Sequence, residues 1–426
     1  MTTRTLQAAP AAERPRGGLR QALAAPLLVA VAVQNVGNLL LHAVLGRVLS
    51  PAEYGALGTV LSLMVLLTVP LGALQAAASA SAARDGGASH ARSLQRLVLW
   101  SVVAGAVVVA LAPVPMQAFH LDSFWDAAIL GPFVTVSVVL AVLRGRLLGV
   151  RRVGLVATTF LASVAVRLAV ALALVHSSPV TGALLATLLG EVVALAIAVV
   201  GVRRGARVDV SAAGAWLPFT EVVRSGAVIG GLFLFTTIDL FLARHFLPRD
   251  ESGQYVAAAT IAKTLLALPA AALAAAYPRF VAAARTSRRP GELRRSAIVV
   301  LGLAATGAVL VAALPGLVLA VLYGSSYPDA ARLVQVLALV AGVSAVASLS
   351  TYALLAVRSP GALLPLVGTV VEVALIVASH DDALAVARGS AIAALLTSAA
   401  MAVALVADVR RRPAYVARHL ATSIAA

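Results

Sequence analysis

Five ionisable residues lie within long apolar segments, where a charge is expensive to keep. They are Arg167, Glu191, Asp239, Lys263 and Glu372. A charged side chain at the centre of a bilayer costs roughly 2.5–3.5 kcal/mol on insertion scales, and such residues normally face a helix-bundle interior or a water-filled cavity. Carboxylates there can bind protons or cations, and cationic side chains can bind anions. These five residues are therefore candidates for binding a substrate or coupling an ion.

The depths of these residues along the expected helices predict two ion pairs. At a rise of ~1.5 Å per residue, Arg167 and Glu191 lie about 12 Å and 15 Å below the same membrane edge. By the same arithmetic, Asp239 lies about 10 Å and Lys263 about 12 Å below that edge. Each pair either neutralises itself within the helix packing or serves the substrate or a coupling ion. Glu372 has no cation at similar depth, and is either a hydrogen-bonded carboxyl or a proton-linked switch.

Polar side chains also form a stripe on the first apolar segment. Gln34, Asn38 and His42 recur at i, i+4 and i+8 beside Asn35, and Gln75 lies just past Pro70 in the second segment. The stripe serves either interhelical hydrogen bonds, at about 0.6 kcal/mol each, or the lining of a cavity for hydroxyl-rich cargo. The cavity candidates are Asn35, Asn38, Gln75, Asp239 and Lys263, and the candidates for coupling or intramembrane ion pairs are Arg167, Glu191 and Glu372.

The elements that must position these residues are membrane-spanning helices. Of the 426 residues 61% are hydrophobic and 12% are charged, against ~45–50% and ~25% in soluble proteins. The segments lack the alternation of a membrane barrel, which leaves helices. We expect an all-α polytopic membrane protein with about twelve transmembrane helices in two six-helix lobes around a central cavity. The expected spans are 22–45, 55–83, 97–116, 125–143, 155–175, 181–202, 225–246, 255–283, 297–322, 333–356, 361–379 and 388–407.

The longest interior polar connection divides the spans into two groups of six. Pro70 in the second span and Pro269 in the eighth occupy similar places in the two halves, and each should bend its helix. This correspondence favours two related lobes. The predicted organisation is a cytoplasmic tail at 1–21, an N-lobe at 22–202, a cytoplasmic connection at 203–224, a C-lobe at 225–407 and a cytoplasmic tail at 408–426.

Arginine placement predicts the orientation in the cytoplasmic membrane. Cations near span ends are retained on the cytoplasmic side, and 26 of the 33 cations fall on that side when the N-terminus is cytoplasmic. Arg144 is counted among them, whereas Arg47 and Arg244 fall on the outer side. Both termini are thus expected to be cytoplasmic. The net charge of +16 is an orientation signal, helped by anionic lipids, and we expect no nucleic-acid partner.

Several kinds of chemistry are excluded by what the sequence lacks. The chain has no cysteine, so it has neither disulfides nor thiolate ligands. Lys263 follows Ala262, not the glycine of a Walker A loop, and no histidine has a second one at i+4. We expect no metal and no cofactor other than a coupling proton or sodium ion. Outer carboxylates would fit a membrane glycosyltransferase, but the short outward connections leave no acceptor-binding domain. These carboxylates are Asp122, Asp126, Asp250, Glu251, Asp329, Asp381 and Asp382.

One motif resembles a known family. The run between the first two spans, followed by Pro70 and Gln75, resembles the polysaccharide-exporter flippases of the multidrug/oligosaccharidyl-lipid/polysaccharide (MOP) superfamily; it reads Arg47-Val48-Leu49-Ser50-Pro51-Ala52-Glu53-Tyr54-Gly55. The resemblance implies translocation of a polyprenyl-diphosphate-linked glycan by alternating access. It also implies membrane lipids as partners, together with glycan polymerase or glycosyltransferase machinery. The arginine-rich, lysine-poor composition is similar to that of bacteria with GC-rich genomes.

The resemblance further implies which residues meet the substrate. In that family spans 1, 2, 7 and 8 line the cavity, and cationic side chains receive the diphosphate, which points to Lys263 here. Because Arg167 and Lys263 are the only cations we expect at depth, an arginine-rich cavity is not predicted. The alternative within the same fold is a small-molecule drug antiporter, which favours an acidic, aromatic-lined cavity. The aromatic content of 5% makes that alternative less attractive.

Overall fold

The computed structural model describes residues 17–84, 91–204, 219–285 and 290–424, and these residues form helices and turns with no strand. Most of the predicted tail at 1–21 and of the connection at 203–224 lies outside the described residues. The predicted C-terminal tail, as far as it is described, continues the last helix, α17, which runs from Ala383 to Ile424.

The first nine helices form the N-lobe. Proline stands at the first turn of several of them, where its missing N–H removes no helical hydrogen bond. Ser50 caps α2 in a capping box with Glu53, which fixes the tight turn after α1. The helices are α1 (Gly17–Val48), α2 (Pro51–Thr68), α3 (Leu71–Arg84), α4 (Ala91–Ala110), α5 (Pro113–Ala118), α6 (Phe124–Ala128), α7 (Leu130–Gly149), α8 (Val153–Leu174) and α9 (Pro179–Arg203).

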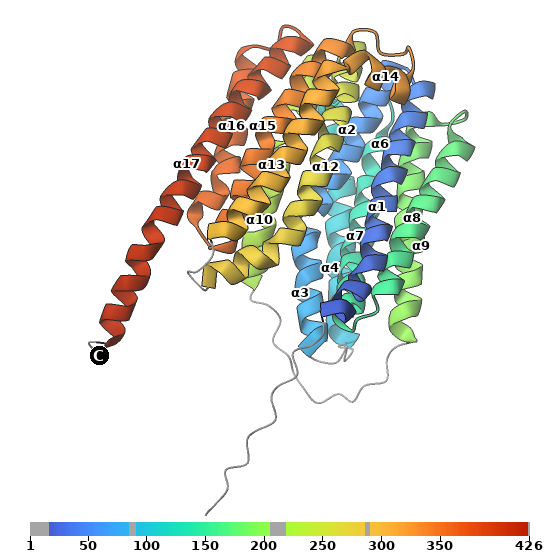
Figure 1. Cartoon of the computed structure of the whole chain (residues 1–426). Coiled ribbons are helices and arrows are strands. Elements are labelled where there is room, and N and C mark those ends of the chain that lie inside the picture. The colour runs from blue at the N-terminus through green and yellow to red at the C-terminus, as the bar shows by residue number, and fades with distance from the viewer. Residues whose placement is uncertain (1–16, 85–90, 205–218, 286–289, 425–426) are drawn as a thin grey trace, which may run out of the picture.

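The remaining helices form the C-lobe. Figure 1 shows them side by side with the N-lobe, and α17 extends furthest from the bundle. They are α10 (Phe219–Phe235), α11 (Ile238–Phe246), α12 (Arg249–Arg285), α13 (Pro290–Ala313), α14 (Pro315–Tyr323), α15 (Ala330–Ala356), the short 3-10 helix η1 (Pro360–Leu363), α16 (Leu364–Ala378) and α17.

The expected all-helical architecture with many spans is confirmed. Within the described residues, ten segments are long and apolar enough to cross a membrane, and the bent pair α10 and α11 makes an eleventh if it is one span. The 37-residue α12 packs between α2 and α15 and covers the remaining expected span, 255–283. The protein is an all-helical, multi-pass membrane protein.

Spans 2 and 7 are among those that divide into two helices, and of these two divisions only the one in span 2 was predicted. Span 2 divides into α2 and α3 at Pro70, as proline's missing donor requires. In contrast, α12 continues through Pro269 without interruption. The second break lies in span 7, where α10 and α11 meet at an angle of 47°. It falls at Thr236 and Thr237, which no proline marks.

The lobes meet most closely through α2 and α12. Gly55 and Gly253 lie at this crossing, and a Cβ atom added to Gly253 would collide with the Pro51 carbonyl. We call this end of the molecule the closed end; it contains the α1–α2 turn at 49–50, the α11–α12 turn at 247–248 and, in Figure 1, helix α14. Only glycine allows the two backbones to approach so closely there.

Candidate functional site

The larger cavity lies inside the N-lobe. It has a volume of about 440 Å³ and is lined by residues of α1, α2, α3, α7, α8 and α9. We call it the N-lobe cavity. Its charged and amide-bearing lining residues are Gln34, Asn38, Gln75, Arg144, Arg167 and Glu191.

Glu191 is the centre of a polar network in this cavity. Its Oε2 lies 3.7 Å from Nη1 of Arg144, and its Oε1 lies 3.9 Å from Nη2 of Arg167. Ser163 donates a hydrogen bond of 2.9 Å to the same carboxylate. Arg167 in turn donates to Oδ1 of Asn38 at 2.7 Å. The predicted Arg167–Glu191 pair is therefore confirmed, with a second arginine added to it.

Arg144 is held rigidly by its neighbours. Its Nε donates to Thr159 Oγ1 at 2.9 Å, and its guanidinium lies 4.1 Å from the centre of the Phe160 ring. Such stacking suits the flat, weakly hydrated guanidinium. The residue is 8% exposed. Its charge is thus kept away from bulk water and at a fixed place in the wall of the cavity.

The two guanidinium groups retain hydrogen-bonding capacity. Nη2 of Arg144 and Nε of Arg167 are buried and have no hydrogen-bond partner. Buried donors are almost always satisfied, and one left unpaired costs about 1–3 kcal/mol or more when it is charged. Among the Arg, Lys, Asp and Glu residues of the lining, two are positive and one is negative. The cavity is therefore suited to an anion that accepts several hydrogen bonds.

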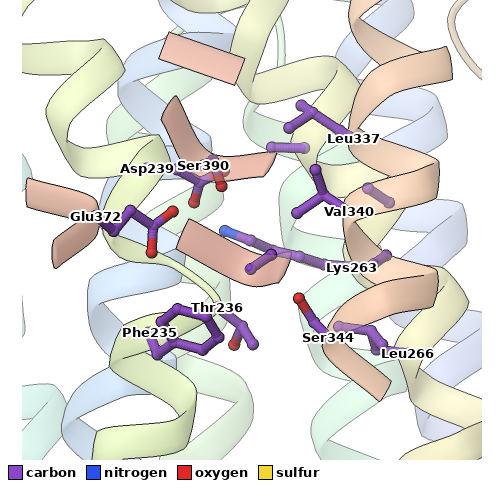
Figure 2. A pocket seen from close by; sticks show the side chains of 14 residues that line it. Phe235, Thr236, Asp239, Lys263, Leu266, Leu337, Val340, Ser344, Glu372 and Ser390 are labelled. Carbon is purple, nitrogen blue, oxygen red and sulfur yellow. The ribbon is translucent and has the colours of Figure 1, made fainter. Parts of the chain in front are cut away.

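A second, much smaller cavity of about 30 Å³ lies inside the C-lobe. Asp239 of α11, Lys263 of α12 and Glu372 of α16 contribute to its wall, together with Ser344 and Ser390. Figure 2 shows the Lys263 amine directed toward the two carboxyl groups. We call this the C-lobe cavity. It has room for a water molecule or two, not for a sugar.

The three charged groups of the C-lobe cavity are incompletely paired. Nζ of Lys263, Oδ1 of Asp239 and Oε2 of Glu372 are all buried without a hydrogen-bond partner. Oδ2 of Asp239 accepts from the Tyr255 hydroxyl at 2.8 Å. The structure thus brings Asp239 and Lys263 to one cavity without a hydrogen bond between them, and it adds Glu372 to the group.

The N-lobe and the beginning of the C-lobe match a known protein family. A family model described as "Polysaccharide biosynthesis protein" matches residues 24–284, which is more than half of the chain. The chain belongs to this polysaccharide biosynthesis protein family. A comparison with curated proteins finds no match.

Solved structures similar to this polysaccharide biosynthesis protein share its fold. An inward-facing multidrug resistance MATE family transporter of the MOP superfamily has a TM-score of 0.68 and 15% identity, covering 90% of this chain and 98% of its own. The lipid II flippase MurJ, in an inward closed conformation, has a TM-score of 0.65 and 10% identity; the match covers 89% of this chain and 87% of MurJ. A MOP superfamily transporter from Pyrococcus furiosus has a TM-score of 0.62 and 18% identity; the match covers 91% of this chain and 95% of that transporter. These likenesses, all below 20% identity, show that the protein has the fold of MOP superfamily transporters and flippases.

The cavity candidates from the sequence do not form one site. Asn38 and Gln75 line the N-lobe cavity, whereas Asp239 and Lys263 line the C-lobe cavity. Asn35 is exposed and lines neither of them. Depth along a span places residues at similar heights, but it does not say which helices pack together.

Sequence reasoning missed Arg144, which we expected in a cytoplasmic connection. The fourth span was expected to end at residue 143, but α7 continues to Gly149 and keeps Arg144 inside the lobe. The apolar residues Leu147 and Leu148 that follow Arg144 were the available signal, because they prolong the buried face of the helix. The expectation that arginine would be scarce at depth was therefore wrong.

Proposed function

We propose that this polysaccharide biosynthesis protein moves a lipid-linked oligosaccharide or polysaccharide precursor across the cytoplasmic membrane by alternating access. In this proposal the N-lobe cavity receives the anionic diphosphate end of the precursor. The observation that carries it is the pair of buried arginines, each with an unpaired donor, that face a single carboxylate. With both termini cytoplasmic, as the arginine distribution favours, the closed end faces outward.

The chemistry of the cavity suits a diphosphate. A guanidinium group presents donors in a planar fork that matches two phosphate oxygens, and charge-assisted bonds of this kind are about twice as strong as neutral ones. Arg144 and Arg167 approach Glu191 from α7 and α8, so an anion beside them meets two helices at once. The proposal thus gives Arg144 and Arg167 the diphosphate-binding role that the family resemblance implied for Lys263.

The glycan end of the precursor has suitable partners as well. Gln34, Asn38 and Gln75 line the same cavity, and amides can both donate to and accept from sugar hydroxyls. A volume of about 440 Å³ is typical of a small-molecule site. It fits a head group, not a polymer, so the lipid chain would remain in the bilayer. Glycosyltransferase or polymerase machinery would act before or after this step.

The drug-antiporter alternative fits the N-lobe cavity less well. That function favours an acidic, aromatic-lined site for organic cations. The Arg, Lys, Asp and Glu residues of the cavity wall instead give a net positive charge, and its phenylalanines are limited to Phe133 and Phe160, the latter of which stacks on Arg144. A cationic drug would be repelled by the two guanidinium groups.

We further propose that the C-lobe cavity binds the coupling ion, and that this ion is a proton. Asp239 and Glu372 face the ammonium of Lys263, so two negative groups share one built-in positive group. A single added proton brings the net charge of Asp239, Glu372 and Lys263 to zero. A sodium ion would have to displace the ammonium or sit beside it in a space of about 30 Å³, where like charges repel strongly.

Reconstitution in liposomes tests the proposed function. The purified protein is incorporated with a fluorescent short-chain lipid-linked oligosaccharide, and an impermeant quencher reports the fraction that crosses the bilayer. Arg144→Gln and Arg167→Gln should each slow crossing by about tenfold or more, since each removes charge-assisted bonds. Arg203→Gln, at the exposed end of α9, is the matched control. Equal rates in all these proteins would reject the N-lobe cavity as the substrate site.

The same liposomes test the coupling ion. A pH gradient should accelerate crossing, whereas a sodium gradient at constant pH should not. Glu372→Gln should remove the response to the pH gradient. Acceleration by sodium alone would contradict the choice of a proton, but it would leave the transport proposal standing.

A further inference from the structure

Arg47 and Arg244 occupy equivalent places in the two lobes. Each lies four residues before a proline at the start of the following long helix: Pro51 is the first residue of α2, and Pro248 immediately precedes α12. Both arginines therefore stand at the closed end, in the last turn of α1 and of α11.

Each of these arginines bonds to the opposite lobe. Arg47 of the N-lobe donates through Nε to the Leu322 carbonyl at 3.2 Å and through Nη2 to the Val321 carbonyl at 2.5 Å, both at the end of α14. Arg244 of the C-lobe donates through Nε to the Phe119 carbonyl at 2.9 Å, just after α5. It also reaches the His120 carbonyl at 3.4 Å.

The acceptors on the two sides lie at similar places. Both α5 and α14 are short helices followed by a residue of positive φ: His120, two residues after the end of α5, with φ 49°, and Gly324, directly after α14, with φ 69°. The final carbonyls of a helix lack intrahelical partners and carry partial negative charge, so a cation there is favourable. Carbonyls at the end of α14 thus accept hydrogen bonds from Arg47, and carbonyls just after α5 accept them from Arg244. Nδ1 of His245, beside Arg244, also contacts the Ala118 carbonyl at 2.8 Å.

The two contacts differ in burial. Arg244 is 1% exposed and also donates to Ser252 Oγ at 2.9 Å, which fixes it within its own lobe. Arg47 is exposed. A buried charge that loses its partners is far more costly than an exposed one, so the Arg244 contact should be the stronger of the two.

We propose that Arg47 and Arg244 are reciprocal latches between the lobes, and that both must release before the closed end can open. The proposal rests on the alternating access of the proposed function, because only a protein that opens this end needs a releasable closure there. Hydrogen bonds to carbonyls suit this purpose, since water can replace them once the lobes separate.

A single introduced cysteine can report the opening. The chain contains no cysteine, and Val256 of α12 is fully buried, with its side chain directed at Gly58 of α2 across the lobe boundary. In Val256→Cys protein, reconstituted in nanodiscs, a polar maleimide should react only when α2 and α12 part. The rate of labelling then measures how often the closed end opens, without any substrate.

The latch variants are compared in this background. Arg244→Gln should raise the labelling rate by about tenfold and Arg47→Gln by about threefold, and the double variant should exceed either. Arg332→Gln, an exposed arginine in the first turn of α15, is the matched control and should leave the rate unchanged. Because Arg47 is exposed, its variant should fold even if Arg244→Gln does not, and a gel-filtration profile checks each.

Unchanged labelling in Arg47→Gln and in folded Arg244→Gln would overturn the latch proposal. Equal acceleration by Arg332→Gln would overturn it as well, since any loss of charge would then suffice. Failure of the proposed function would appear elsewhere, as an absence of lipid-linked glycan crossing by the unaltered protein, which this labelling does not require.

Discussion

Arg144 and Glu191 approach within 3.7 Å in the wall of the N-lobe cavity, although residue 144 was expected in a cytoplasmic connection. The same carboxylate lies 3.9 Å from Arg167. One negative group therefore faces two positive groups in a buried space. In the proposed function, an anion that enters the cavity bonds to donors that Glu191 leaves unpaired.

Glu191→Gln should destabilise the empty protein and strengthen its response to an anion. Two buried guanidinium groups lose their counter-charge, which costs about 3 kcal/mol. We expect a lower Tm than in the unaltered protein, and a larger rise in Tm on addition of pyrophosphate, because a ligand that binds only the folded state stabilises it. Asp381→Asn, at an exposed position, should change neither quantity. If pyrophosphate raised the Tm of Glu191→Gln and of the unaltered protein by the same amount, this would show that it does not bind beside Glu191.

Arg144→Lys should not restore the function of Arg144. Lysine keeps the charge but loses the planar fork, the bond to Thr159 and the stacking on Phe160. We expect at least a tenfold loss in affinity for a soluble sugar diphosphate, measured by calorimetry. Arg203→Lys serves as the matched substitution at an exposed site, with unchanged affinity. Wild-type affinity in Arg144→Lys would mean that charge alone is recognised.

Gly253→Ala should force the lobes apart at the closed end. The added methyl group would collide with the Pro51 carbonyl, a backbone atom that cannot turn away. We expect faster maleimide labelling of Val256→Cys in this variant and a loss of thermal stability. Gly302→Ala on α13, where nothing lies within 4 Å, should instead be neutral or slightly stabilising, because alanine favours helix. Identical behaviour of the two variants would contradict the close crossing of α2 and α12.

Lys263→Met and Glu372→Gln should interact strongly in a double-mutant cycle. Removal of Lys263 alone leaves two carboxyl groups facing one small cavity, and Glu372→Gln then relieves part of that repulsion. We expect a coupling free energy of about 1–3 kcal/mol from thermal unfolding, typical of residues in one network. Thr264→Val, an exposed neighbour on α12, should combine additively with Glu372→Gln. If the effects of Lys263→Met and Glu372→Gln on unfolding were additive, the two side chains would not interact in one network.

The spans were predictable because their signals are local. Apolar length and the arginines near span ends both act within one helix or turn. Pro70 marked the break in span 2 for the same reason. The break at Thr236 and Thr237 carries no such mark, since these residues are compatible with a helix. It was therefore invisible in the sequence.

The amino-acid sequence by itself determined that this chain is a bundle of about twelve membrane helices with a few charges at depth, because the apolar length of a segment and the position of a charge along it are local properties of the sequence. Only the tertiary structure decided that Arg144 joins Arg167 and Glu191, while Lys263 joins Asp239 and Glu372 in the other lobe. The position of a residue along a helix follows from counting, whereas its partners depend on helix rotation and on which helices are neighbours. Both of these are set by packing between segments far apart in the chain.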